Sequence, residues 1–126
     1  MSLADKISDS ELEVMRILWR EGKAISFSDI RVELQSLRGW DKSTINTLIR
    51  RLADKGVISA VKREIIYYTA NISRAEYTRT QEKNMLDKLY DGSAKNFVAA
   101  LCDSGKLSEA DIDELKKYFQ MGGSKK

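Results

Sequence analysis

Residues 40–63 gather the side chains whose chemistry is most readily recognised in this sequence. Six are cations, set against only two acids, and these cations are Lys42, Arg50, Arg51, Lys55, Lys62 and Arg63. Short hydrogen-bonding side chains stand between them, namely Ser43, Thr44, Asn46 and Thr47. Lysine and arginine neutralise phosphates, while hydroxyl and amide groups can read the edges of bases. This segment therefore predicts contact with a nucleic acid.

The same segment has the periodicity of a helix. Its apolar positions recur at i, i+3, i+4 and i+7, and they are Ile45, Leu48, Ile49 and Leu52. Ser43 is predicted to cap the N-terminus of this helix, and Gly56 to end it in a left-handed conformation. A helix with one buried face and one basic, hydrogen-bonding face suits the major groove of DNA.

Four other segments share a helix-start pattern that the basic helix lacks. Each has Ser at the cap, an acid three residues later and apolar residues at N′ and N4, and the four caps are Ser8, Ser26, Ser73 and Ser108. With Ser43 as the cap, the N′, N3 and N4 positions hold Lys42, Asn46 and Thr47. The missing acid suits a helix whose positive dipole end meets phosphate. A solvated polar first turn is the alternative interpretation, and the sequence leaves both open.

Composition limits the class of protein. Of the 126 residues, 42% are hydrophobic and 33% are charged, which suits one domain or two small ones. The net charge is only +3, and its excess lies between residues 40 and 63, which indicates an anionic partner met at one surface. No apolar run could span a membrane and residues 1–6 do not resemble a signal peptide, so we expect a cytoplasmic protein without a membrane partner.

Several kinds of chemistry are not expected. The sequence has no histidine and one cysteine, Cys102, which excludes serine or cysteine triads, intrachain disulfides and multi-cysteine zinc sites. No glycine-rich loop could cradle a phosphate, and no motif gathers convergent carboxylates. We therefore predict no enzyme, no catalytic residue, no cofactor and no metal. The apolar run around Cys102 favours a packed rather than a reactive thiol.

The first half of the chain is predicted to form a winged helix-turn-helix domain. Helices are expected at residues 8–21, 26–38 and 43–55, with Ile30, Leu34 and Leu37 on one face of the second. Two β-branched and aromatic runs, residues 57–61 and 65–69, predict a hairpin. Its basic tip would place Lys62 and Arg63 beside a DNA backbone, with an ordinary solvated turn as the alternative.

The second half shows no strand signal. Helices are predicted at residues 73–90, 93–104 and 108–121, followed by a flexible tail at 122–126. Three short helices make a poor independent core, so their apolar stripes favour a homodimer. The expected interface positions are Tyr77, Met85, Leu86, Leu89, Phe97, Leu101, Ile112, Leu115 and Phe119. The fold prediction is thus mainly α with a small β-hairpin wing: a DNA-binding domain at 1–71 and a helical dimerisation domain at 72–121.

With these residues in view, the chain resembles the penicillinase and methicillin-resistance repressor family from about Ile7 to Phe119. The resemblance rests on Glu11-Leu12-Glu13-Val14-Met15-Arg16-Ile17-Leu18-Trp19, on Gly39-Trp40 and on Ser43-Thr44-Ile45-Asn46-Thr47-Leu48-Ile49-Arg50-Arg51-Leu52 with Lys55-Gly56. It continues through the tyrosine-bearing second wing strand to Lys88-Leu89-Tyr90-Asp91-Gly92. The helical tail matches more loosely.

The resemblance implies a winged-helix dimer that silences β-lactamase genes from a two-fold, double-stranded DNA operator. It assigns base reading to Thr44, Asn46 and Thr47, near the N-terminus of the basic helix. Backbone contacts are assigned to Lys42, Ser43, Arg50, Arg51, Lys55, Lys62 and Arg63. Either Arg50 or Arg51 could instead read a guanine, and the sequence does not decide between them.

The resemblance also implies a way to end repression. In the antibiotic-responsive members a membrane-bound sensor protease triggers cleavage of an Asn-Phe bond in the dimerisation domain, and here Asn96-Phe97 stands at that place. The cut would sever the last two helices and weaken the dimer. In the alternative, Phe97 is ordinary core and Asn96 an ordinary exposed residue. A copper-responsive branch carries clustered cysteines that this chain lacks, so metal sensing is not expected.

Two other functions compete with control of β-lactam resistance. One is a repressor of the same architecture with other target genes and another inducer. The other is a winged-helix module that binds a protein and reads no DNA, although such modules usually lack a basic third helix.

Overall fold

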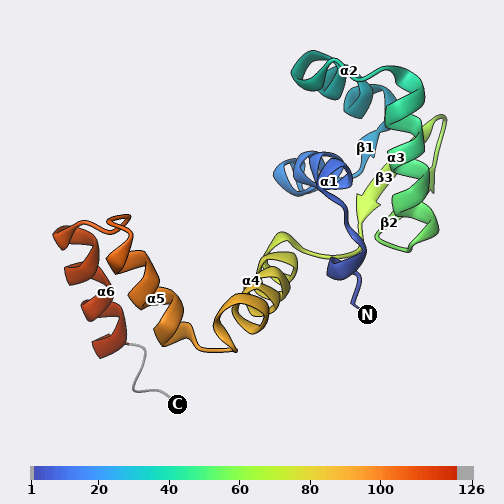
Figure 1. Cartoon of the computed structure of the whole chain (residues 1–126). Coiled ribbons are helices and arrows are strands. Elements are labelled where there is room, and N and C mark those ends of the chain that lie inside the picture. The colour runs from blue at the N-terminus through green and yellow to red at the C-terminus, as the bar shows by residue number, and fades with distance from the viewer. Residues whose placement is uncertain (1, 122–126) are drawn as a thin grey trace. The chain divides into compact units, whose positions relative to one another are not determined.

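The computed structural model describes residues 2–121, except for the side chains of Phe119 and Met121, and the predicted tail at 122–126 lies outside these residues (Figure 1). In chain order the elements are a short 3-10 helix η1 (Ala4–Lys6), α1 (Asp9–Glu21), β1 (Ile25–Ser26), α2 (Phe27–Arg38), α3 (Lys42–Asp54), β2 (Ile58–Lys62), β3 (Ile66–Ala70), α4 (Arg74–Tyr90), α5 (Ala94–Asp103) and α6 (Glu109–Met121). The predicted mainly helical fold with a small hairpin is confirmed.

The chain divides into two compact units, residues 1–82 and 83–126. The sequence-based boundary at residue 71 differs from this one by the first half of α4. Tyr77 accounts for the difference, because its ring packs on Trp19 with 5.3 Å between centroids. The indole Nε1 of Trp19 also donates to the carbonyl oxygen of Ile72 at 2.8 Å, which joins the start of α4 to α1.

The first unit has a dense apolar core between α1, α2, α3 and the sheet. The predicted stripe of α3 lies wholly within it, with Ile45, Leu48, Ile49 and Leu52 all buried. In α2, Ile30 and Leu34 are buried, whereas Leu37 on the same face of the helix is 66% exposed. Leu37 lies in the last turn of α2, where the helix has run past the core.

The sheet has the strand order β1-β3-β2, and all pairings are antiparallel. The hairpin runs in register from Ile58 opposite Ala70 to Lys62 opposite Ile66. At its base, the side-chain Nδ2 of Asn71 donates to the carbonyl oxygen of Gly56 at 2.9 Å. The wing therefore starts directly from the end of α3, as Figure 1 shows in green.

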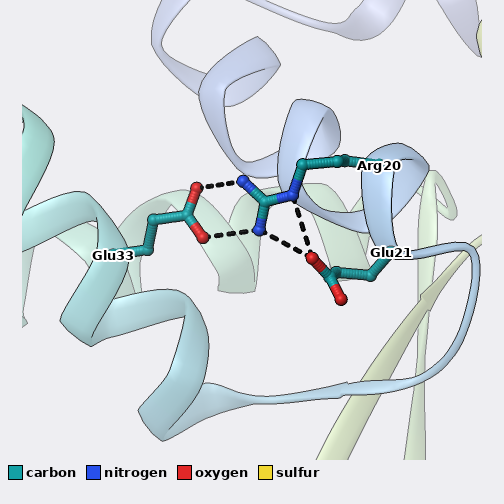
Figure 2. A network of polar contacts seen from close by, with 3 residues as sticks. All are labelled: Arg20, Glu21 and Glu33. Carbon is teal, nitrogen blue, oxygen red and sulfur yellow. Dashed lines mark hydrogen bonds and ion pairs between the residues drawn. The ribbon is translucent and has the colours of Figure 1, made fainter.

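An ion-pair network clamps α1 to α2 (Figure 2). The guanidinium of Arg20 donates to both carboxylate oxygens of Glu33 at 2.6 Å and to Glu21 at 2.9 Å. The hydrogen bonds from Arg20 lower the pKa of the Glu33 carboxyl. Bidentate geometry fixes the direction as well as the distance of such a pair, so the two helices are held in one orientation.

The observed helix N-caps agree with the sequence-based prediction at Ser8 and Ser108 but differ from it at α3. Ser8 and Ser108 form both hydrogen bonds of a capping box, as predicted. Helix α3, however, begins at Lys42 and is capped by Asp41, whose Oδ1 accepts from the amide of Thr44 at 2.8 Å. The prediction of Ser43 as the cap is therefore wrong, and the acid is present at the cap itself. The N′ and N4 positions then hold the apolar residues Trp40 and Ile45.

The second unit, by contrast, has no buried residue among those whose side chains the structure describes. Its best-covered apolar side chains are only half-buried, and Leu89 is 62% and Tyr118 70% exposed. Tyr90 and Phe97 pack together with 5.5 Å between ring centroids. Cys102 is exposed, so the expectation of a packed thiol is wrong.

Within the described residues no helix is long and apolar enough to cross a membrane. The same part of the chain holds no group of three or more Cys, Asp or Glu side chains arranged to bind a metal ion.

Candidate nucleic-acid interface

The outer face of α3 is polar and accessible. Lys42, Ser43, Thr44, Asn46, Arg50 and Arg51 are exposed, and Thr47 is half-buried. With 100° between successive residues, Ser43, Thr47 and Arg50 point away from the apolar stripe, and Thr44 and Asn46 flank them on opposite sides. The buried stripe thus fixes which side chains face outward.

Hydrogen bonds in the first two turns of α3 determine which polar groups remain available to a partner. The Asp41 carboxylate accepts from the backbone amide of Thr44, and this hydrogen bond is the chief reason why the pKa of the Asp41 carboxyl is lowered. Thr47 donates its hydroxyl to the carbonyl oxygen of Ser43 at 3.0 Å, which leaves the oxygen lone pairs of Thr47 as acceptors. Since Ser43 does not cap the helix, its exposed hydroxyl is available to an outside partner.

A groove of about 400 Å³ lies between α3 and the wing. It is lined by Phe27, Ser28, Asn46, Ile65, Ile66 and Tyr68. The groove therefore brings together the start of α2, the first half of α3 and the wing. Ile65 and Ile66 are 53% and 41% exposed. The sequence predicted Ile65 and Ile66 to lie within a strand, and it did not indicate that they lie beside Asn46. The one sequence feature that pointed to an exposed apolar surface here is the presence of two apolar residues next to the basic tip of the wing.

The wing carries two exposed cations, Lys62 and Arg63. The guanidinium carbon of Arg63 lies 5.4 Å from the centroid of the Tyr67 ring, a distance suited to a cation–π contact. The backbone amide of Arg63 donates to the carbonyl oxygen of Ile65 at 3.1 Å and tightens the turn. The wing tip thus carries exposed positive charge on a short loop that is held by a backbone hydrogen bond and a cation–π contact.

Lys55 is placed differently from the other cations of residues 40–63. Its ammonium donates to Glu11 Oε1 at 2.6 Å and to the carbonyl oxygen of Lys6 at 2.7 Å. Burial raises the pKa of the Glu11 carboxyl, but hydrogen bonds from Lys55 and Ser8 outweigh burial and leave that pKa below its ordinary value. Glu11 is therefore charged at neutral pH.

The candidate cleavage bond lies in the first turn of α5. Ser93 caps this helix by accepting from the amide of Asn96 at 3.1 Å, and its carbonyl oxygen accepts from the amide of Phe97 at 3.2 Å. Asn96 is exposed and Phe97 is half-buried against Tyr90. A first turn held by one cap is a place where a helix opens readily.

The positions expected at a dimer interface fall into three groups. Tyr77 packs on Trp19 inside the first unit. Those in the second unit are half-buried or exposed, and they are Met85, Leu86, Leu89, Phe97, Leu101, Ile112 and Leu115. The side chain of Phe119 lies outside the described residues.

Three helices, a hairpin wing and an outward polar face on the third helix define a winged helix-turn-helix protein of the DNA-binding type. The chain belongs to the penicillinase repressor family, whose model matches residues 7–121. This is a family of transcriptional repressors and not of enzymes, as the sequence indicated.

Individual relatives agree with this assignment. A penicillinase repressor of Staphylococcus aureus is 37% identical over 112 residues, 88% of each chain, and one of Bacillus licheniformis is 30% identical over 121 residues, 95% of this chain and 94% of its own. The solved structure of Bacillus licheniformis BlaI, in its monomeric form in complex with the blaP half-operator, is 36% identical and superposes with a TM-score of 0.51 over 56% of this chain and 87% of that one.

Proposed function

We propose that this protein is a transcriptional repressor that binds a two-fold, double-stranded DNA operator as a homodimer in the cytoplasm. The observation that carries the proposal is the outer face of α3, where exposed polar and basic residues stand opposite a fully buried stripe. Such a helix can enter the major groove with its N-terminal residues against base edges. The similarity to a BlaI structure with a half-operator supports the same docking.

The proposed contacts follow from where the side chains lie. Thr44, Asn46 and Thr47 read bases, because they stand in the first half of α3 on its exposed side. Phosphate contacts fall to Lys42, Ser43, Arg50, Arg51, Lys62 and Arg63. Lys55 is left out of this set because Glu11 holds its ammonium.

The proposed dimer forms through the second unit. Its helices leave apolar side chains half-covered, and burying such surface against a second copy stabilises both chains. Two linked reading heads bind a dyad far more tightly than one head binds a half-site, because the second contact is intramolecular. In functional terms the proposed division stays at residues 1–71 for DNA binding and 72–121 for dimerisation.

The proposed target genes are those of β-lactam resistance, and the proposed signal is cleavage at Asn96-Phe97. A protease needs its substrate extended, so the first turn of α5 must open before the bond is cut. Cleavage would separate most of α5 and all of α6 from the DNA-binding unit, and the dimer would lose those apolar positions. Operator affinity would then fall to that of separate heads.

Fluorescence anisotropy over a salt series tests operator binding. A duplex that carries the dyad upstream of the protein's own gene is compared with a scrambled duplex of equal length. We expect tighter binding to the dyad, two chains per duplex and a steep loss of affinity with salt. Thr47→Ala should erode the preference, while Arg63→Ala should weaken both duplexes. Lys116→Ala removes the same charge from α6 and serves as the control. Equal, weak binding to both duplexes would overturn the proposal and favour a protein-binding module.

Mass spectrometry tests the signal. The chain is expressed beside a β-lactam sensor protease with and without antibiotic, and fragments ending at Asn96 are expected only with both. Phe97→Ala should abolish this cut, whereas Val98→Ala, one residue further on, should leave it. A chain that stays intact under induction would direct attention to a repressor of other genes with another inducer.

A further inference from the structure

Lys55 stands apart among the basic residues of 40–63. Within the described part of the chain it is the one member of this group that forms an ion pair, and its partner Glu11 is only 2% exposed. The pair joins positions 44 residues apart in sequence. It was not visible in the sequence, where Lys55 resembles any other cation of the basic segment.

The pair ties the end of α3 to the start of α1. Glu11 Oε1 accepts from the ammonium of Lys55 at 2.6 Å and from the backbone amide of Ser8 at 3.0 Å, so one oxygen serves both the cap of α1 and the cation. The carbonyl oxygen of Lys6 accepts a second hydrogen bond from the same ammonium, at 2.7 Å. The cation is thus held from two sides.

The backbone around Lys55 ends the helix at the same point. The backbone amide of Lys55 donates to the carbonyl oxygen of Arg51, and the backbone amide of Val57 donates to the carbonyl oxygen of Leu52, both at 3.0 Å. Gly56, with φ of 80°, makes this closure possible. The side chain and the backbone of Lys55 therefore fix the C-terminal end of α3 together.

We propose that Lys55 is a positioning residue for DNA recognition: paired with Glu11, it fixes the angle at which α3 presents its outer face, and it makes no phosphate contact. The inference rests on the proposed function, since it concerns how α3 meets DNA. Moving the ammonium to a phosphate would leave the Glu11 carboxylate buried and unpaired, which is strongly unfavourable. A cation already neutralised within the protein also releases no counterion from DNA.

The test compares four variants with the wild-type dimer on the dyad and scrambled duplexes. Lys55→Met removes the cation, Lys55→Arg keeps it, Glu11→Gln removes its charged partner, and Arg51→Met is the matched loss of an exposed cation. The readouts are the slope of log affinity against log salt and the ratio of dyad to scrambled affinity. All binding measurements are made at a temperature well below the lowest unfolding midpoint among the variants, and the folding of each variant is checked by circular dichroism.

We expect Arg51→Met to reduce the salt slope by about 2 for the dimer, one contact for each chain. Lys55→Met should leave the slope unchanged and lower the dyad preference about tenfold, comparable to one mismatched base pair. Lys55→Arg should restore that preference. Glu11→Gln should lower it without reducing the slope, because it removes no cation, and this keeps the test decisive if Lys55→Met fails to fold.

Two outcomes overturn the inference, and they are distinguishable. If Lys55→Met reduces the slope as Arg51→Met does, while Glu11→Gln binds normally, Lys55 is a phosphate ligand. If the wild-type dimer shows no dyad preference at all, the proposed function fails and the role given to Lys55 fails with it.

Discussion

The two units of this chain differ in what they bury. Among the residues whose side chains the structure describes, all 15 buried hydrophobic ones lie in the first unit, between Ala4 and Ile72. In the second unit every described side chain is half-buried or exposed. Yet both units contain well-capped amphipathic helices, as the hydrogen bonds of Ser8 and Ser108 illustrate.

This difference separates helix formation from core formation. Caps and periodicity are local properties, and both units have them. A core needs several elements to close around the same apolar surface, which α1, α2, α3 and the sheet do and the helices of the second unit do not. The first unit is therefore expected to be stable alone, and the second to depend on a partner.

The largest expected effect comes from placing a charge on the second unit. Leu101→Asp should convert a dimer to monomers and weaken dyad binding about 100-fold or more, because avidity is lost. Sedimentation and anisotropy measure the two effects. The unfolding midpoint of the first unit should not change. Ala99→Asp, at an exposed position of the same helix, is the control. Dimers that persist in Leu101→Asp would contradict the proposed interface.

A cavity should cost more in the first unit than in the second. Leu52→Ala removes a fully buried side chain and should lower the free energy of unfolding by about 3 kcal/mol. Ile112→Ala removes a half-buried one and should cost about 1 kcal/mol when measured on the isolated monomer. Urea titration measures both values. Equal costs would mean that the second unit has a core of its own.

Acid should weaken the first unit. The folded state lowers the pKa of Glu33, through hydrogen bonds from Arg20, and that of Glu11, where Lys55 and Ser8 outweigh burial. Their contribution is full above the unfolded pKa and is lost as pH falls through the lower, folded pKa. We expect the unfolding midpoint to fall between about pH 5 and pH 2. The double variant Glu11→Gln, Glu33→Gln should flatten this dependence; an unchanged slope would contradict the assignment.

The smallest effect distinguishes the two candidate caps of α3. Asp41→Ala removes the observed cap and should cost about 1 kcal/mol of stability in thermal unfolding. Ser43→Ala should leave stability nearly unchanged and weaken operator binding, because its exposed hydroxyl faces outward. The opposite pattern, with Ser43→Ala the more destabilising, would restore Ser43 as the cap.

The sequence predicted the six main helices and the buried stripe of α3 from periodicity, and the hairpin from composition, because all of these are local patterns. It misplaced the cap of α3, since Asp41 and Ser43 are both good caps two residues apart and only the backbone conformation decides between them. It could not find the Glu11 pair of Lys55, because the partner comes from a distant helix. It also missed the groove beside Asn46, which requires the wing to fold back toward α3.

The fixation of α3 at both ends has a consequence for protein engineering. Asp41 holds one end, and Gly56 with Lys55 holds the other, through contacts that do not involve the side chains of Asn46 and Thr47, two of the proposed base-reading residues. Those two positions can therefore be randomised as an exchangeable cassette while the scaffold stays intact. A library built there, selected against new half-sites, would retarget the protein without redesigning its fold.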